Sequence, residues 1–311
     1  MTEHAYLDHA ATTPVDPAVM HAMLECLGSD GVYGNPSSTH ATGRAARARV
    51  EQARRQVAEL IGAAAEEIVF TSGATEADNL AILGAARFRR AFGAHVVTAV
   101  TEHPAVVESC RALEREGFSV TWLRPDQQGI ITPEALQAAL TDDTILVSLM
   151  HVNNEIGVVQ DIAGFGRVCR AHGALLHVDA AQSAGREPIL VRDQCVDLLS
   201  LSAHKMYGPK GVGALFIDAT RLRRVAPLMF GGGQERGIRP GTIPVHQVVG
   251  LGVACELARE RRVEDGVRIR TMRDLLWAEV SDLAGVSRNA AQAPMASHIL
   301  SISVFGVHGE T

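Results

Sequence analysis

Short runs of apolar residues alternate along the chain with longer stretches in which apolar positions recur every three or four residues. Continuous apolar runs are typical of strands buried on both faces, and the recurring pattern is typical of helices packed on a sheet. Strands are therefore predicted over residues 67–72, 95–100, 118–123, 144–150, 174–179, 196–202 and 211–217. Helical stretches separate most of them, so the pattern predicts an α/β protein with a mostly parallel central sheet and helices on both faces.

The two ends of the chain differ from this repeating middle. Residues 6–14 show neither the apolar run of a buried strand nor the repeat of a helix, and they are predicted to form an extended arm. We expect a large domain over residues 15–260 and the start of a smaller C-terminal α/β domain over residues 261–311, after an arm of residues 1–14. Helices are predicted over residues 19–26, 42–61, 73–87, 104–116, 132–140 and 162–172 and from 242 to about 283, and a last strand over residues 298–305.

Composition narrows the possible partners of this chain. Hydrophobic residues make up 47% of the sequence, which is enough for a large core. A net charge of −6 argues against binding to nucleic acid or to an anionic membrane surface. The N-terminus has no secretory pattern and no segment is long and apolar enough to span a bilayer, so we expect a cytoplasmic protein. The five scattered cysteines show no metal-ligand spacing and are predicted to be buried, reduced thiols.

Lysine use points to a particular chemistry. Lys205 and Lys210 are the only lysines in the chain, whose other permanent cations are all arginines. A primary amine can lose its proton and form an imine with a carbonyl, which a guanidinium cannot do. Lys205 follows a predicted buried strand, whereas Lys210 lies in a Gly-Pro-Lys-Gly turn that suits a solvated cation. The alternative is that two lysines survived by chance in an arginine-rich chain.

Polar side chains also follow several other predicted strands. His103, Asn154, Asp179 and Ser202 all come at or just after the carboxyl end of a strand, where open α/β sheets bind their ligands. Each has a simpler explanation as a helix cap, a turn residue or a satisfied histidine. A single ligand near all of these strand ends would explain them together.

Pyridoxal phosphate has the carbonyl, the ring nitrogen and the phosphate that such a set could hold. Lys205 would form the imine, Asp179 would pair with the ring nitrogen, and His103 would stack on the ring and move protons. The strand, Ser-Gly turn and helix start around Thr75 form a pattern that binds anions. Ser72 and Thr75 could instead, or at the same time, cap the helix together with Glu76. The phosphate would therefore be held by Thr75, Ser202 and His204.

Longer motifs carry a family resemblance over nearly the whole chain. The motifs are Tyr6-Leu-Asp, Gly34-Asn-Pro-Ser-Ser, Thr71-Ser-Gly-Ala-Thr-Glu-Ala-Asp-Asn, Thr101-Glu-His-Pro-Ala, His151-Val-Asn-Asn-Glu-Ile-Gly, His177-Val-Asp-Ala-Ala-Gln, Ser202-Ala-His-Lys-Met-Tyr-Gly-Pro-Lys-Gly and Gly232-Gly-Gln-Glu-Arg-Gly. In these motifs the sequence resembles the cysteine desulfurases, which are fold-type I pyridoxal-phosphate enzymes of the class V aminotransferase group, and in particular the branch that supplies sulfur for iron-sulfur cluster assembly.

The resemblance implies a role for each matching residue. Lys205 would be the Schiff-base lysine, Asp179 the partner of the ring nitrogen, and His103 the stacking and proton-moving histidine. Gln182 would bond the phenolic oxygen, with Asn154 beside it. The remaining cofactor contacts implied are Ala74, Thr75, Ser202 and His204, and Thr242 toward the neighbouring subunit, which implies a homodimer with shared sites. The expected reaction converts L-cysteine to L-alanine and delivers sulfur as a protein persulfide to acceptor and iron-sulfur scaffold proteins.

The end of the chain is where the match to this family pattern stops. The family continues past the motif that matches residues 307–310 into a loop with the nucleophilic cysteine and a carboxylate-binding arginine. We therefore expect this truncated chain to bind pyridoxal phosphate without turning over cysteine, with Cys195 as the only conceivable substitute nucleophile and with apolar surface uncovered at residues 299–305. The alternatives are a non-catalytic cofactor-binding or dimerisation module, a selenocysteine lyase, or another class V aminotransferase.

Overall fold

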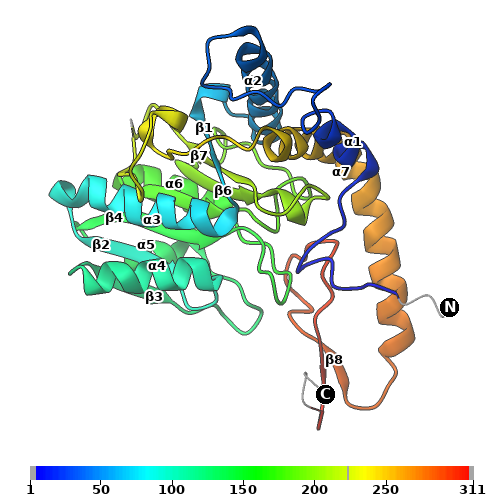
Figure 1. The fold of residues 1–311 in the computed structure, drawn as a ribbon. Helices are drawn as coiled ribbons and strands as arrows, with labels where there is room; N and C mark the ends of the chain where they lie inside the picture. Colours follow the sequence, from blue (N-terminus) through cyan, green and yellow to red (C-terminus); the bar gives the residue numbers. More distant parts are fainter. Residues whose placement is uncertain (1–4, 223, 308–311) are drawn as a thin grey trace.

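A seven-stranded sheet forms the centre of the computed structural model, which describes residues 5–222 and 224–307 (Figure 1). The order of its strands across the sheet is β1-β7-β6-β5-β4-β2-β3. The bounds are β1 Ile68–Thr71, β2 His95–Ala99, β3 Ser119–Leu123, β4 Thr144–Met150, β5 Leu175–Asp179, β6 Leu198–Ser202 and β7 Gly213–Ile217. Only β7 runs antiparallel to its neighbours, so the prediction of a mostly parallel sheet is confirmed.

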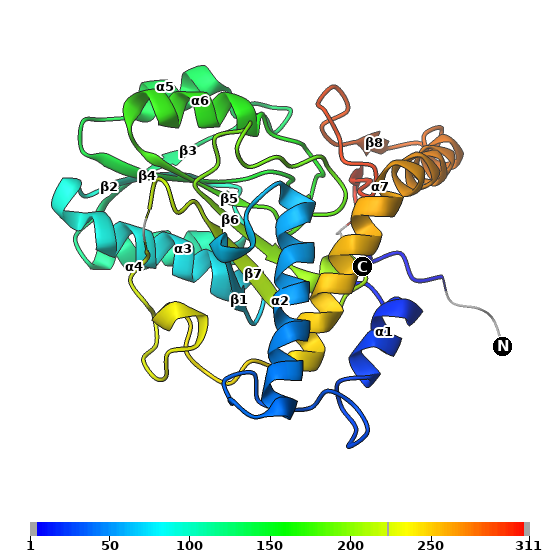
Figure 2. The same ribbon diagram turned by 90° about the horizontal axis from the view of Figure 1, so that it is seen from above.

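Helices cover both faces of this sheet, as predicted. Helices α3 (Ala74–Arg89) and α4 (Pro104–Arg115) pack on one face, and α2 (Ala41–Ile61), α5 (Pro133–Ala139) and α6 (Ile162–His172) pack on the other. Figure 2 shows α5 and α6 on the side of the sheet opposite to α3 and α4. The central strands are buried at every position because both of their faces are covered, which is why their sequences lack a regular alternation of apolar and polar residues.

Local signals explain where the helices start and stop. His40 accepts a hydrogen bond from the backbone N–H of Gly43 and caps the start of α2, and Gly62 ends this helix with a left-handed φ of 69°. A close backbone approach is needed where α3 begins: a Cβ on Gly213 of β7 would lie 2.7 Å from the Cα of Gly73. Glycine at these two positions brings the first turn of α3 against the end of the sheet.

The long helix α7 (Val245–Val280) joins two different environments. Its first turns pack against α1 (Pro17–Leu24) and α2, where Val248, Leu251 and Cys255 are buried. Its later turns expose Val263 and Met272 beyond the sheet (Figure 1). The helix is continuous across the domain boundary expected at residue 260, and that boundary stays a prediction.

The C-terminal segment departs from the sequence prediction. The expected strand over residues 298–305 is reduced to β9 (Ile302–Val304), which pairs with an unpredicted strand, β8 (Val286–Arg288). Ile299 is buried against Val152 and Ala296, so the expectation that it would be uncovered was wrong. Phe305 is 92% exposed, in agreement with the expectation of uncovered apolar surface here. Residues 298–305 therefore begin as a loop that packs through Ile299 and end as one strand of a short, exposed hairpin.

Within the described residues, no helix combines the length and apolar character needed to cross a membrane.

Candidate active site

The carboxyl ends of the parallel strands open into a cavity of about 640 Å³. The end of the sheet, the start of α3 and the N-terminal arm all contribute to its wall. Its lining residues are Asp8, Ala10, Ala11, Thr12, Ser72, Gly73, Ala74, Thr75, Glu76, Asp78, His103, Met150, Val152, Asn154, Glu155, Asp179, Ala181, Gln182, Ser202, His204, Lys205, Lys210 and Gly211. The structure thus brings together all but one of the site residues expected from sequence, the exception being Thr242.

Lys205 enters the cavity from the short 3₁₀ turn η3 (Ala203–Lys205) that follows β6. Its Nζ donates hydrogen bonds to the backbone oxygens of Ala10 and Ala11 in the arm. Burial lowers the pKa of this amine, although the nearby carboxylate of Asp179 opposes the shift. A lysine with a lowered pKa is a better nucleophile near neutral pH, because more of it is uncharged.

The N-terminal arm is held at Lys205 by main-chain bonds. The backbone N–H and the hydroxyl of Thr13 both donate to the backbone oxygen of His204, at 2.9 and 3.0 Å. The hydroxyl of Thr13 also accepts from the backbone N–H of Tyr207 at 2.9 Å. The arm therefore forms part of the site's wall rather than a free extension.

Asp179 ends β5 and is only 6% exposed. Its Oδ1 accepts a hydrogen bond of 2.8 Å from the backbone N–H of Ala181. Burial raises the pKa of this carboxyl, while that hydrogen bond, His103 and Lys205 all act to lower it. A buried carboxylate of this kind is costly unless a cation joins it, so its place in the cavity favours a ligand with a positively charged or protonated group.

The part of the cavity wall at the start of α3 suits an anion. Helix α3 starts at Ala74, and the first N–H groups of a helix have no partner within it. The hydroxyl of Ser202 is buried without a hydrogen-bond partner among the described residues, and it lies 3.9 Å from where a Cβ on Gly73 would be. Free N–H groups, a positive helix end and an unpartnered hydroxyl are what a phosphate binds.

Glu76 is the one negative group in this first turn. Its carboxylate accepts from the backbone N–H of Ser72 at 2.7 Å and pairs with Arg239 at 2.8 Å. Burial opposes the shift, but the bonds from Arg239 and Ser72 lower the pKa of Glu76. Arg239 thus compensates the charge of Glu76, and the helix cap and the anion site can exist together.

The cavity is also lined by His103, Asn154 and Gln182. Nδ1 of His103 accepts a hydrogen bond of 3.1 Å from the backbone N–H of Ala105, so this histidine also caps α4. The neutral ring therefore carries its proton on Nε2. Asn154 donates to Glu155 at 2.6 Å, and Gln182 donates to the backbone oxygen of Ala10 at 2.8 Å.

Thr242 and Lys210 differ in their relation to the cavity. Thr242 is exposed and is absent from the cavity wall, so its expected contact with a neighbouring subunit stays a prediction. Lys210 is exposed as expected for a turn, but it also belongs to the cavity lining. The turn after η3 brings it back to the rim, which the sequence pattern did not indicate.

Two buried carboxyl groups near the site were not predicted from the sequence. Asp78 on α3 is buried beside the cavity, its Oδ1 lies 3.6 Å from Nε2 of His177, and burial raises its pKa well above the usual range. Glu102 is buried and accepts from the backbone N–H of Met150, and burial raises its pKa too. The available signal for Asp78 was a carboxylate at an otherwise apolar helical position.

The cysteines are remote from this cavity. Burial raises the pKa of the thiols of Cys110 and Cys169 to about 12, and it also raises those of Cys26 and Cys255. None of the five cysteines lines the cavity. Cys195 corrects the prediction that all five are buried: it is half-exposed, with a left-handed φ of 54°, in the connection before β6.

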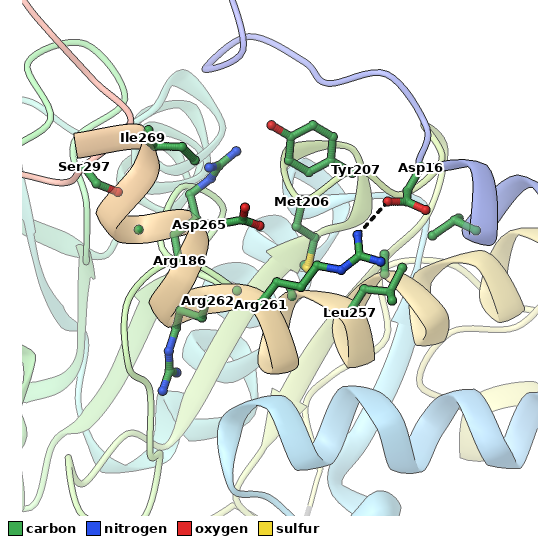
Figure 3. Close-up of a pocket in the computed structure, with 15 residues that line it drawn as sticks. Asp16, Arg186, Met206, Tyr207, Leu257, Arg261, Arg262, Asp265, Ile269 and Ser297 are labelled. Atoms are coloured by element: carbon green, nitrogen blue, oxygen red, sulfur yellow. Dashed lines mark hydrogen bonds and ion pairs between the residues drawn. The ribbon is translucent and has the colours of Figure 1, made fainter. Parts of the chain in front are cut away.

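A second, smaller pocket of about 50 Å³ lies behind the lysine-bearing turn (Figure 3). Met206 and Tyr207 face Leu257 of α7 across it, and Arg261 of α7 pairs with Asp16 at 3.0 Å. Arg186 also lines this pocket and donates to the backbone oxygen of Lys205 at 3.0 Å. The pocket is too small for a cofactor, and its residues support the turn that presents Lys205.

Comparison with known proteins places this site in a family. The chain matches the family described as aminotransferase class-V over residues 5–311. It is 53% identical over 307 residues to a cysteine desulfurase IscS of Klebsiella pneumoniae (strain 342), covering 98% of this chain and 76% of the relative. A cysteine desulfurase IscS of Serratia proteamaculans (strain 568) is 52% identical over the same length.

Solved structures agree with this result. A protein described as NifS-like superposes with a TM-score of 0.95 at 35% identity, covering 99% of this chain and 84% of that one. A structure of SspA in complex with cysteine superposes with a TM-score of 0.84 at 39% identity, covering 94% of this chain and 81% of that one. The chain therefore belongs to the class V aminotransferase family, in its cysteine desulfurase branch, which confirms the resemblance and the fold class expected from its motifs.

Proposed function

We propose that this protein is a pyridoxal-phosphate-dependent cysteine desulfurase, which converts L-cysteine to L-alanine and passes the sulfur on as a persulfide. The observation that carries the proposal is the cavity itself, which combines the amine of Lys205, the carboxylate of Asp179 and the anion site at the start of α3. One cavity thus offers a partner for each of the carbonyl, the ring nitrogen and the phosphate of a single molecule.

The residues present fit this cofactor. The unpartnered hydroxyl of Ser202, the first N–H groups of α3 and Thr75 would hold the phosphate, with Ala74 at the helix start. His204, whose Nδ1 lies 3.1 Å from the hydroxyl of Thr12, would complete this end. Asp179 would face the ring nitrogen and would gain the positive partner that its burial calls for.

When bound, the cofactor supplies an electron-withdrawing ring that stabilises negative charge at the substrate's α-carbon. Lys205 would provide the amine that holds the cofactor and could serve as a base toward the α-proton. Asp179 would keep the ring nitrogen protonated through its negative charge. His103 presents an N–H on Nε2 to the site, and protonating its Nδ1 would break the cap of α4. Hydrogen-bond donation is therefore the role of His103 that the geometry favours.

L-Cysteine is the proposed substrate. The related SspA structure is described as a complex with cysteine, and the curated relatives are named cysteine desulfurases. Asn154 lines the cavity beside Gln182 and would lie next to this substrate. The thiol that receives the sulfur is not assigned to any of the five cysteines, because the four buried ones have raised pKa values and none lines the cavity.

The partners proposed follow from the family. A cytoplasmic homodimer with Thr242 serving the neighbouring site would fit the exposed position of this residue, and sulfur-acceptor and iron-sulfur scaffold proteins would take the product. These assignments are supported by the similarity to IscS proteins rather than by a contact within this chain.

Cofactor uptake and substrate chemistry can be tested separately. The purified chain would be incubated with pyridoxal phosphate, reduced with borohydride and mapped by mass spectrometry, and the unreduced form would be mixed with L-cysteine, L-serine or L-selenocysteine. We expect a cofactor label on Lys205 and an absorbance change that is larger with L-cysteine than with L-serine. Absence of any lysine-bound cofactor would refute the proposed function, and a response to selenocysteine alone would favour a selenocysteine lyase.

A further inference from the structure

His298, in the C-terminal segment, contacts Gln182, a residue of the cavity wall. Nε2 of His298 lies 3.3 Å from Oε1 of Gln182, and Gln182 in turn donates from its Nε2 to the backbone oxygen of Ala10 at 2.8 Å. The same oxygen of Ala10 accepts from Nζ of Lys205. A chain of contacts therefore runs from His298 through the amide of Gln182 to the oxygen that also holds the amine.

The direction of every bond in this chain can be deduced. A backbone oxygen can only accept, so the NH₂ group of Gln182 must face Ala10 and its Oε1 must face His298. Oε1 can also only accept, so Nε2 of His298 must carry a hydrogen. The backbone oxygen of Ala10 thus shows which way the amide points and which tautomer the histidine has, two assignments that are ordinarily ambiguous.

The surroundings keep this imidazole neutral. Burial lowers the pKa of His298 to about 3, and the positive charges of Arg186, Lys205 and Arg273 act in the same direction. Nδ1 of the ring has no solvent contact and no hydrogen-bond partner among the described residues. A second proton on Nδ1 would be a buried, unpaired charge next to three cations, so Nε2–H is the form that persists.

The segment that carries His298 is itself fixed in place. The backbone N–H of Ala296 donates to Gly157 at 2.9 Å, and Arg273 of α7 donates to the oxygen of Ala296 at 2.8 Å. Ile299 is buried beside Val152. The imidazole is therefore held against Gln182 by a packed loop rather than by its own hydrogen bond alone.

We infer that His298 is a positioning residue which locks the amide of Gln182 so that its NH₂ group, and not its oxygen, is presented to the cavity. Gln182 Nε2 has a second hydrogen, for which the described residues offer no acceptor. This hydrogen selects a ligand oxygen that carries negative charge. The inference rests on the proposed function in one respect: in the loaded protein that oxygen is the phenolic oxygen of pyridoxal phosphate.

The cofactor-bound protein gives the first test. A donor at the phenolic oxygen lowers the proton affinity of the lysine-linked cofactor, so losing the donor raises the pH at which its absorbance band changes. We expect Gln182→Ala to raise this midpoint by about one pH unit. His298→Phe should raise it by about half a pH unit, because the amide of Gln182 would then point its NH₂ group into the cavity only part of the time. The double variant should shift no further than Gln182→Ala alone.

Two controls separate positioning from packing. His298→Gln keeps an N–H near the position of Nε2 and should restore the original midpoint. Asn289→Ala removes a hydrogen bond to Ser301 in the same C-terminal segment and keeps the imidazole and the anchors at Ala296, so it should leave the midpoint unchanged. Equal shifts in Asn289→Ala and His298→Phe, or additive shifts in the double variant, would overturn the inference.

The second test is made on the unsubstituted protein and needs no bound cofactor. Nitrogen-15 NMR of the histidine rings distinguishes the Nε2–H tautomer from the Nδ1–H tautomer and from the charged ring. We expect His298 to remain neutral with its hydrogen on Nε2 from pH 5 to pH 8, in the range where an ordinary histidine titrates. A protonated ring or an Nδ1–H tautomer would refute the role of His298 even if the protein binds no cofactor, in which case the proposed function fails separately.

Discussion

The two lysines of this chain are five residues apart, yet they lie in different environments. Lys205 is half-buried, donates to two carbonyls of the N-terminal arm and lies near the buried carboxylate of Asp179. Lys210 is exposed in the following turn, at the rim of the same cavity. The difference favours Lys205 as the reactive amine, because its amine is both held by hydrogen bonds and partly desolvated.

Removing the amine of Lys205 should have the largest effect. Lys205→Ala and Lys205→Arg should both abolish covalent attachment of pyridoxal phosphate, because neither side chain can form an imine. Borohydride reduction and peptide mapping would measure this in each variant. A label that moved to Lys210, or wild-type labelling in Lys205→Arg, would show that the comparison assigns the wrong lysine.

Removing the negative charge near Lys205 should have the next largest effect. Asp179→Asn should still bind the cofactor but lose the substrate's α-proton about 100-fold more slowly, since a neutral amide does not keep the ring nitrogen protonated. Exchange of the α-proton of L-cysteine with deuterium from solvent would report this step. Exchange at the wild-type rate would mean that Asp179 does not have this role.

The anion site should contribute affinity without affecting which lysine reacts. Ser202→Ala removes the buried hydroxyl that has no described partner, and it should weaken binding of pyridoxal phosphate about tenfold. Pyridoxal without the phosphate is the matched ligand, and its binding should be unchanged. Equal losses for both ligands would place the hydroxyl's role in folding instead.

The pH dependence of attachment should distinguish the two amines. Because burial lowers the pKa of Lys205 below the usual value of 10.5, the neutral, reactive form appears as the pH rises and is complete at a lower pH than for an ordinary lysine. The rate of attachment should therefore rise with pH and level off below that value, as followed by absorbance. A rate that still climbs through 10.5 would indicate an unperturbed amine.

Substitutions of Lys210 should have the smallest effect on cofactor binding. Lys210→Ala removes an exposed charge at the rim, and we expect less than a threefold loss in cofactor affinity, relieved at high salt. Lys210→Arg should match the wild type at any salt concentration. A large loss in Lys210→Arg would reveal a role that depends on the amine itself.

Most of the sheet could be predicted from the sequence because its strands are buried on both faces. The strand predicted at 174–179 corresponds to β5, and that at 144–150 corresponds to β4 with the same bounds. The strand predicted at 298–305 failed because an apolar run can equally serve a loop: Ile299 packs into a small cluster while only Ile302–Val304 pairs. Local pattern alone does not say which partner an apolar residue finds.

The sequence by itself determined the chemistry of this protein: the rare amine at a strand end, the carboxylate of Asp179 and the glycine turn before α3 all belong to local patterns. Only the tertiary structure decided how these groups are held. The carbonyls of Ala10 and Ala11 contact Lys205 across more than 190 residues of chain, and His298 contacts Gln182 across 116. Backbone oxygens have no sequence signature, and a buried histidine looks like any other, so contacts of this kind arise only when distant segments pack together.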